Sequence, residues 1–462
     1  YYISRVRIIK YKFWYYISDP CEALYNSLVS RVKNLRTNEG DTNMLTFREL
    51  YDRLVKASFN KSLNEEIDNL RKNDEFNEDD LNYILHPENY PSVIRTGACD
   101  SCSSEKIPAC EVACLFSAIK RDEDGKVIVE QNDCTGCGRC VEVCENKGLV
   151  ERKDLIPILE LLHSKTVPVY AMIAPAFNGQ FTLDVTAGKL RSAFKCLGFY
   201  GMLEVALFAD ILTLKEALEF DRTIHEDKDY MLTSCCCPIW VAMIKKIYHD
   251  LIPHMPPSVS PMVACGRAIK SIHPDAVTVF IGPCIAKKAE AKEPDIKDAV
   301  DYVLTFQEIK ELFDLAEIDF SGLPEDLRDH SSKAGRIYAR TGGVSEAVQS
   351  TLNRLNPGRK IPLRAAQANG AVECKRLLKD ITEGEIKANF MEGMGCVGGC
   401  VGGPKALIPY KEGTEHVIEY GDLAAYSTPI DNPHAIELLE QLGFNSIEDL
   451  LERDNLFIRK FT

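Results

Sequence analysis

Residues 233–240 read TSCCCPIW, three adjacent cysteines closed by a proline and a tryptophan. Adjacent side chains cannot all face one way from a single backbone, so the three thiols are expected to serve different purposes. This stretch begins where a predicted strand stops, and so does GPCIAKK at 282–288. In α/β sheets ligands bind beyond the carboxyl ends of the strands, which makes both stretches candidates for a binding site.

The chain around these stretches alternates short apolar runs with helical patterns, which indicates an α/β region with largely parallel strands. The predicted strands are VPVYAMIA (167–174), MLEVALFA (202–209), VTVFIG (277–282) and DYVLTF (301–306). The predicted helices include LTLKEALEF (212–220), FQEIKELFDLA (306–316), VSEAVQSTLNRL (344–355) and AVECKRLLKDI (371–381).

The composition of the whole chain is that of a globular protein with several domains. Its 462 residues predict two to four domains, with 45% hydrophobic and 27% charged residues. A formal net charge of −14 argues against nucleic acid or an anionic membrane as partner, because both favour clustered Lys and Arg. The apolar first twenty residues are interrupted by Arg5, Arg7, Lys10 and Lys12, a pattern that cannot cross a bilayer. We therefore expect a cytoplasmic protein without a membrane span.

Eighteen cysteines in a long chain without a secretory signal indicate metal binding rather than disulfides. Between residues 99 and 144 they read C-D-S-C, C-E-V-A-C and C-T-G-C-G-R-C-V-E-V-C. The last run has the order of a bacterial ferredoxin, whose fourth cysteine reaches across to a second 4Fe-4S cluster. A zinc site is the alternative for C-x-x-C pairs, but this order favours two 4Fe-4S clusters. The expected ligand sets are Cys114, Cys134, Cys137 and Cys140 for one cluster, and Cys99, Cys102, Cys110 and Cys144 for the other.

Three long motifs follow: TSCCCPIW at 233–240, IGPCIAKKAE at 281–290 and FMEGMGCVGGC at 390–400, which continues as VGGP. Here the chain resembles the diiron (iron-only) hydrogenases, in a variant subgroup with a TSCCCPxW motif. The family motifs are T-S-C-C-P-x-W, P-C-x-x-K-x-x-E and E-x-M-x-C-x-x-G-C. The resemblance implies reversible reduction of protons to H2, with electrons passing through the two ferredoxin-type clusters to an H-cluster.

The same resemblance implies a fold with α/β and α+β parts. We expect a helical N-terminal region over residues 1–90 and a ferredoxin-like domain with two 4Fe-4S clusters over 91–153. Residues 154–462 are expected to form a two-lobed α/β catalytic domain with the H-cluster between the lobes.

The H-cluster of this family is a 4Fe-4S cluster bridged to a diiron unit with CO, cyanide and a dithiolate. The resemblance implies that Cys400 bridges to the diiron unit, that Lys287 donates to a cyanide, and that Met394 and Pro175 line the unit. Taken alone, Lys287 would be a solvated helix residue and Met394 a core residue. The implied ligands of the 4Fe-4S part are Cys237, Cys284, Cys396 and Cys400.

Alignment on Pro238 makes Cys236 the proton-shuttling thiol of the family. Cys235 is then either a small buried residue or one that alters the mobility of the loop, so that the Cys236 thiolate could block the open iron against oxygen. A thiol suits proton transfer because its ordinary pKa of about 8.5 lies near working pH. In the family the proton route continues through two glutamates about one helical turn apart. Glu216 and Glu219 match that spacing as an i, i+3 pair, although an exposed helix face would also produce it.

The outer part of the predicted route departs from the family pattern. Pro256 and Pro257 stand where the family commonly has a serine, and proline offers neither a hydroxyl nor an N–H. We therefore expect Ser258 or a water to bridge between the glutamates. Arg222, a turn beyond Glu219, would complete the route at the surface.

Two other classes of protein remain open. A hydrogenase-like iron–sulfur assembly factor keeps its clusters but makes no H2, and it would have no need of Cys236, Lys287 or Met394. An H2 or redox sensor would need an output module, and residues 1–90 contain none that can be identified. For the hydrogenase we expect ferredoxin or a similar electron carrier, H2 and protons, and hydrogenase maturation proteins as partners.

Overall fold

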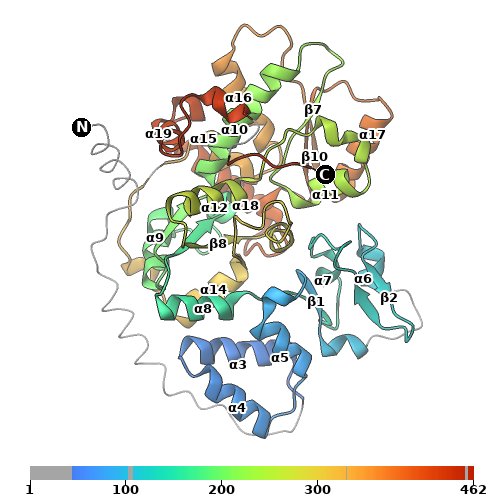
Figure 1. Ribbon diagram of the computed structural model, residues 1–462, viewed down its shortest axis with the longest axis vertical. Coiled ribbons are helices and arrows are strands. Elements are labelled where there is room, and N and C mark those ends of the chain that lie inside the picture. The colour runs from blue at the N-terminus through green and yellow to red at the C-terminus, as the bar shows by residue number, and fades with distance from the viewer. Residues whose placement is uncertain (1–43, 102–107, 329, 453–455, 462) are drawn as a thin grey trace.

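A computed structural model describes residues 44–101, 108–328, 330–452 and 456–461 (Figure 1). The expectations for residues 1–43 and for Cys102 lie outside this range. Three helices at the start of the described chain lie below α8 (Leu155–Ser164) in Figure 1, and the first and third of them pack against it. Thr46 and Glu49 open the first of them with a capping box, in which each side chain accepts the backbone N–H of the other. The three helices are α3 (Phe47–Phe59), α4 (Leu63–Asn73) and α5 (Glu78–Leu85).

The cysteine-rich segment is built from short elements that gather at the lower right of Figure 1. Strands β1 and β4 pair antiparallel, as do β2 and β3. Helices α6 and α7 contact each other and carry Cys110 and Cys140, which are both buried. The elements are β1 (Val93–Arg95), η3 (Gly97–Ser101), α6 (Ala109–Ala113), β2 (Ile119–Arg121), β3 (Val127–Val129), α7 (Arg139–Glu142) and β4 (Leu149–Glu151).

A four-stranded parallel sheet with the strand order β6-β5-β8-β9 forms the first α/β layer. Its central strand β5 is buried at every position, as expected where helices cover both faces of a parallel sheet. The strands are β5 (Val169–Ile173), β6 (Gly201–Glu204), β8 (Val277–Gly282) and β9 (Tyr302–Thr305). Helices α9 (Ala187–Cys196), α12 (Pro261–Ile272) and α14 (Phe306–Leu315) pack against it.

A second parallel sheet with the order β10-β11-β7 lies beside the first, at the upper right of Figure 1. Its strands are β7 (Met231–Leu232), β10 (Ala365–Asn369) and β11 (Phe390–Met394). Helices α11 (Pro238–Lys246), α16 (Gly343–Leu355) and α17 (Ala371–Thr382) pack against β11. Two separate parallel sheets are what a two-lobed α/β domain requires.

Helix α10 (Ala206–Thr223) connects the two sheets and is buried along most of its length. It contacts α12 beside the first sheet and α16 beside the second. The predicted strand over 202–209 is wrong beyond Glu204, because the helix begins at Ala206. A continuous apolar run reads the same in a buried strand and in a buried helix, so periodicity alone could not place this boundary.

The remaining elements are short or lie toward the C-terminal end of the chain. The α-helices are α13 (Ala286–Glu290), α15 (Lys333–Arg336), α18 (Tyr410–Asp422) and α19 (Pro433–Gln441). The 3-10 turns are η2 (Pro87–Asn89), η4 (Pro175–Phe177), η5 (His249–His254), η6 (Phe320–Gly322), η7 (Ile337–Ala339), η8 (Cys400–Gly402), η9 (Pro429–Asp431) and η10 (Ile447–Leu451).

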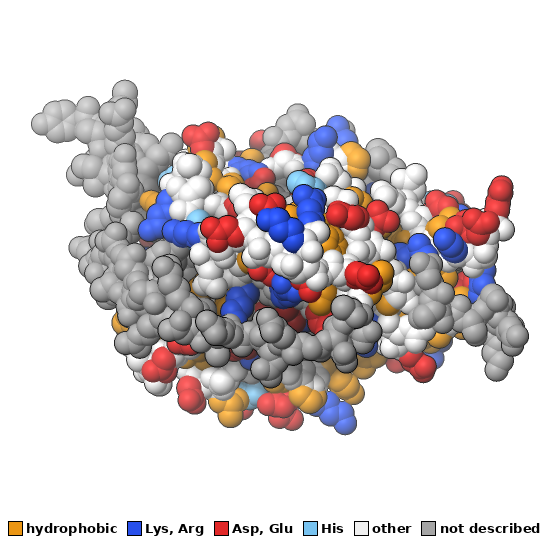
Figure 2. Space-filling view, turned by 90° about the horizontal axis from the view of Figure 1, so that it is seen from below, with side chains coloured by type: hydrophobic (Ala, Val, Ile, Leu, Met, Phe, Trp, Pro, Cys, Tyr) orange, Lys and Arg blue, Asp and Glu red, His pale blue; other side chains and the backbone are white. Residues whose placement is uncertain are grey.

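Charged side chains of both signs are interspersed over the described part of the face seen in Figure 2. No large basic patch appears there, in agreement with the acidic composition. Within the described ranges, every helix is too short or too polar to span a bilayer.

Candidate active site

The three cysteine motifs meet at one buried cavity of about 70 Å³ with an almost wholly apolar lining. Cys236, Pro238 and Ile239 line it from the first motif, and Pro175 lines it from the turn after β5. The other predicted site residues on its wall are Cys237, Cys284, Lys287, Met394, Cys396 and Cys400. Every residue predicted to bind or line the H-cluster therefore faces the same space.

The cavity forms at the carboxyl ends of two strands from each parallel sheet, β5 and β8 from the first and β7 and β11 from the second. Pro175 follows β5, TSCCC follows β7, Cys284 follows β8, and the segment to Cys400 follows β11. Because the carboxyl ends of parallel strands lie at one edge of a sheet, the four segments converge although the sequence separates them widely. Residues of TSCCCP and of GPCIAKK thus line the same cavity.

The first and third motifs hold each other in place. The Trp240 ring lies directly over Gly393, where an added Cβ would stand 2.0 Å from a ring carbon. Trp240 Nε1 donates to the carbonyl oxygen of Thr233 at 2.8 Å, which fixes the start of the cysteine loop. The N–H of Gly395 donates to Cys237 Sγ at 3.3 Å. The tryptophan and the glycines of the motifs are thus needed for the packing that positions Cys237.

Glu392, the glutamate of the third motif, is fully buried and caps helix α16. Its carboxylate accepts the N–H of Gly342 at 2.7 Å, the N–H of Ser345 at 2.8 Å and the Ser345 hydroxyl at 2.6 Å. Burial raises the pKa of Glu392, and these hydrogen bonds oppose the rise. Sequence reasoning missed this role, and a charged residue within a buried apolar strand was the signal for it.

The thiols of the cavity are strongly disfavoured as bare thiolates. Burial raises the pKa of Cys284 to about 11 and that of Cys400 to about 12, and neighbouring thiols contribute to both. Burial also places the pKa of Cys236 and Cys396 well above the ordinary value. A bound iron–sulfur cluster would relieve this penalty, because iron takes up the thiolate charge. Four converging soft donors in a dry cavity fit such a cluster.

The course of the backbone just before Cys400 depends on Gly399, whose φ of +89° is unfavourable for any other residue. A Cβ there would stand 2.7 Å from the backbone nitrogen of Thr341. Gly399 instead pairs with Arg340 in an isolated β-bridge, next to Cys400. The backbone that presents Cys400 is thus pressed against the η7–α16 segment.

Lys287 is 6% exposed and lines the cavity, so its interpretation as a solvated helix residue is wrong. Its Nζ lies 2.5 Å from the buried carboxylate of Glu290. Burial lowers the pKa of Lys287, but Glu290 and the nearby thiols outweigh burial and raise it. The ammonium therefore stays charged beside the cysteines. Met394 is also buried, at the end of β11.

Glu216 and Glu219 are 3% and 7% exposed, so an exposed helix face is the wrong interpretation for both. The Thr233 hydroxyl donates a hydrogen bond to Glu216, which joins α10 to the cysteine loop. Burial raises the pKa of Glu216 to about 7, against the opposing effects of Thr233 and Lys215. Glu219 forms an ion pair at 2.7 Å with Arg222, whose side chain is half exposed. The predicted route thus runs from the cavity wall toward the surface.

The turn at Pro256–Ser258 packs against the same loop. Cys235 is buried, and its thiol donates to the carbonyl oxygen of Pro256 at 3.7 Å. Ser258 is buried too, and its hydroxyl accepts a hydrogen bond from Lys215 Nζ at 2.8 Å. Sequence reasoning missed Lys215, which stands directly before the predicted route residue Glu216.

Several cysteines of residues 99–144 lie close to one another. Cys110 faces Cys99 and Cys144 closely enough for their charges to interact. Cys134 and Cys137 each face Cys114, and Cys140 faces all three and also Cys110. Cys102 lies outside the described residues. The division of these cysteines into two ligand sets stays a prediction from the ferredoxin order.

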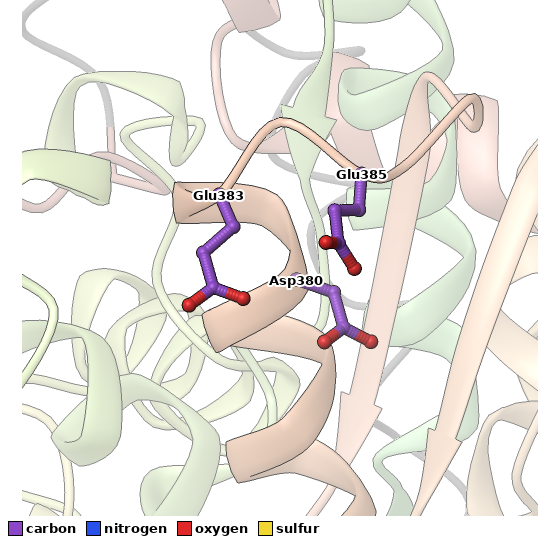
Figure 3. Close-up of side chains that lie close together, drawn as sticks. All are labelled: Asp380, Glu383 and Glu385. Carbon is purple, nitrogen blue, oxygen red and sulfur yellow. The ribbon is translucent and has the colours of Figure 1, made fainter.

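One further group of potential metal ligands, Asp380, Glu383 and Glu385, lies at the end of α17 (Figure 3). Glu383 and Glu385 are exposed, and Lys379 Nζ lies 3.5 Å from Glu383. We regard this group as a solvated acidic helix end, to which no metal is assigned.

Comparison with known proteins relates the part of the chain that forms the cavity to the iron-only hydrogenases. The family model of the iron-only hydrogenase large subunit, C-terminal domain, matches residues 167–404. The NADP-reducing hydrogenase subunit HndD of Solidesulfovibrio fructosivorans is 28% identical, over 67% of this chain and 63% of its own length. The cytosolic iron-sulfur assembly component 3 of Pongo abelii is 24% identical, over 68% of this chain and 80% of its own length. The chain thus spans less than two thirds of the first relative.

Among solved structures, an FeFe-hydrogenase studied for oxygen inactivation of its H-cluster superposes with a TM-score of 0.54 at 25% identity. The match covers 65% of this chain and 98% of that one. The catalytic part of the fold is therefore that of the FeFe-hydrogenases. Since the matching family model also spans about half of the sequence and contains all three motifs, the chain belongs to the family of the iron-only hydrogenase large subunit.

Proposed function

We propose that this chain is a diiron hydrogenase that catalyses the reversible reduction of protons to H2. The cavity that gathers four thiols with Cys236, Lys287 and Met394 carries the proposal. Soft thiolates are the ligands that iron–sulfur clusters select. The proposed ligands of the 4Fe-4S part of the H-cluster are Cys237, Cys284, Cys396 and Cys400.

When bound, the H-cluster would supply the redox-active iron at which protons and electrons combine. The protein residues would hold and orient it, with Cys400 as a thiolate ligand and Lys287 as a donor to a cyanide. Met394 and Pro175 would form apolar walls. The ion pair with Glu290 keeps Lys287 charged and aimed from α13. The apolar lining excludes water, which strengthens each of these interactions.

Cys236 is proposed to be the innermost member of the proton route. It lies on the cavity wall, and the charge of Glu216 acts on its thiol. Protons would enter near Arg222 at the surface and pass through Glu219 and then Glu216 to Cys236, and they would take the reverse course when H2 is oxidised. Because Glu216 has a pKa of about 7, it can both accept and release a proton near neutral pH.

Electrons are proposed to enter through the cysteine-rich segment. Two 4Fe-4S clusters on a ferredoxin-like domain would relay them to the cavity, with ferredoxin or a similar carrier as the external partner. Relatives named as hydrogenases support electron carriers, H2 and protons as partners. The domain boundaries at 90 and 153, the cytoplasmic location and the need for maturation proteins are parts of the same proposal.

A second candidate function is iron–sulfur cluster assembly without a diiron unit. It is supported by the relatives named as cytosolic iron-sulfur assembly components, which align over a comparable share of the chain. Against it, this chain has Cys236, Lys287 and Met394 together on the cavity wall, where an assembly factor has no use for them. A sensor of H2 or redox state would keep the site but pass its signal to a partner.

One experiment separates these candidates. Anaerobically purified protein is incubated with a synthetic diiron cofactor, examined by infrared spectroscopy for CO and cyanide bands, and assayed for H2 evolution. A hydrogenase gives bands and H2, an assembly factor gives neither, and a sensor gives bands with weak turnover. Cys400→Ala should lose the bands, whereas Cys265→Ala, a buried cysteine of α12 away from the cavity, should keep them.

A further inference from the structure

Lys215 is a buried cation beside the proposed proton route that has no role in it so far. Its side chain is 0% exposed, in the interior of α10. Its Nζ donates to Ser258 Oγ at 2.8 Å and to the carbonyl oxygen of Pro257 at 3.5 Å. Among the described residues, its hydrogen-bond acceptors are neutral. Burying an ammonium whose hydrogen-bond acceptors are neutral costs free energy. We therefore expect nearby charged groups to offset that cost.

The position of Lys215 places it beside such groups. It precedes Glu216 by one residue and Glu219 by four, so it lies on the same helix face as Glu219. The turn that holds its ammonium is the one at which Pro256 replaces the expected serine. That turn contacts the cysteine loop through Cys235. The ammonium therefore lies where the helix, the loop and the turn meet.

The charged groups around this point come from several elements. Lys215 faces Glu219, Cys235, Glu216 and Arg222. Glu216 faces Lys215 and Glu219 on α10, Thr233, Cys235 and Cys236 in the loop, Glu392 on β11 and Tyr338 on η7. Of the charged groups that act on Glu216, Lys215 favours its carboxylate form, whereas Glu219 and Glu392 disfavour it.

We propose that Lys215, held by Ser258, is a positioning residue of the proton route, whose ammonium stabilises the carboxylate form of Glu216 beside the gap left by Pro256. Ser258 accepts from the ammonium and so keeps its own hydroxyl proton to donate. The pair thus supplies both the charge and the hydroxyl of this section of the route. Because burial also lowers its own pKa, the ammonium can yield a proton more readily than an exposed lysine.

The test follows the carboxyl C=O infrared band of Glu216 in the full-length protein with its clusters, titrated between about pH 5 and pH 9. Loss of the band in Glu216→Gln assigns it. Lys215→Met removes the charge at similar length, and the midpoint of the band should rise by about one pH unit or more. Lys215→Arg keeps the charge, so its midpoint should lie much closer to the native midpoint than that of Lys215→Met.

Lys245→Met is the matched control, because this lysine of α11 pairs with Glu293 away from the route. Its midpoint should equal that of the native protein. Equal midpoints in Lys215→Met and Lys215→Arg would overturn the proposal. If Lys215→Met does not fold, Ser258→Ala decides, since it removes the 2.8 Å acceptor and should also move the midpoint. An unchanged midpoint there overturns the proposal as well.

The inference rests on the proposed function only in so far as it assigns Lys215 to a route for protons. The carboxyl band is present whether or not the protein turns over H2, so the two failures are distinguishable. In the enzyme loaded with the diiron unit, the pH profile of H2 evolution should move in Lys215→Met with the midpoint of the band.

Discussion

The backbone N–H of Gly395 donates a hydrogen bond to Cys237 Sγ at 3.3 Å. The two residues lie 158 positions apart in the sequence. A side chain at 395 is excluded, because its Cβ would stand 2.6 Å from Ile239. Hydrogen bonds of this kind orient metal ligands and tune cluster potentials. The third motif thus supplies its own thiols and also sets the environment of the thiol from the first.

Replacing a cavity thiol should cost the protein one whole cluster. Cys237→Ala and Cys396→Ala are each expected to lose the iron and sulfide of one 4Fe-4S cluster, because each removes one of its four proposed thiolate ligands. Iron analysis and electron paramagnetic resonance of the reduced protein check this. Cys374→Ala removes a buried cysteine outside the cavity lining and should retain full iron. Full iron in Cys237→Ala would show that the ligand set is wrong.

Loss of the Cys236 thiol should slow turnover without removing the cofactor. Because general acid–base transfer contributes roughly a hundredfold or more, Cys236→Ala is expected to lower H2 evolution by at least about that factor. The infrared bands of the loaded protein should persist. Cys235→Ala is the neighbouring control, since Cys235 faces Pro256 and not the cavity. A loss of less than about tenfold in Cys236→Ala would mean that another group delivers the proton.

Glu216 should make stability depend on pH. Burial raises its pKa in the folded protein from 4.5 to about 7, so the folded state holds a proton that the unfolded chain releases. The stabilising contribution of the protonated form is full below about pH 4.5 and is lost as the pH rises through about 7. Denaturant midpoints between these limits should therefore fall more steeply in the native protein than in Glu216→Gln. Parallel curves for the two proteins would contradict the burial of an ionisable carboxyl here.

Removal of the Glu392 carboxylate should destabilise the fold. Glu392→Ala leaves the N–H groups of Gly342 and Ser345 unpaired in the interior, at a cost of about 1–3 kcal/mol each. Glu392→Gln keeps an acceptor oxygen and should cost less. Chemical denaturation measures both, with Glu383→Ala on the exposed end of α17 as the control. A change below about 1 kcal/mol in Glu392→Ala would show that the cap is replaced by other acceptors.

The four strands of the first sheet were predicted from local patterns, whereas β10 and β11 of the second sheet were not predicted. The convergence of the three motifs was implied by the family resemblance. A buried parallel strand is a short apolar run, and its carboxyl end is where a ligand loop begins. The start of α10 was misplaced because its apolar residues surround the helix, which removes the period that separates helix from strand.

The polar partnerships of the site could not be predicted in the same way. Lys215 and Ser258 are 43 residues apart, and Glu392 and Ser345 are 47 apart. Each pair forms only because packing of α10 and β11 brings its members together. The burial of Glu216 and Glu219 likewise depends on neighbours from other segments, and an i, i+3 pattern alone does not distinguish it from an exposed face.

Isotope exchange tests, without any electron carrier, whether the cavity activates hydrogen as we propose. Protein loaded with the diiron cofactor is placed under H2 in deuterated water, and mass spectrometry follows the release of HD. A hydrogenase with a working proton route produces HD continuously, and Cys236→Ala produces it much more slowly. A loaded protein that shows CO and cyanide bands but releases no HD would contradict the proposed hydrogenase function.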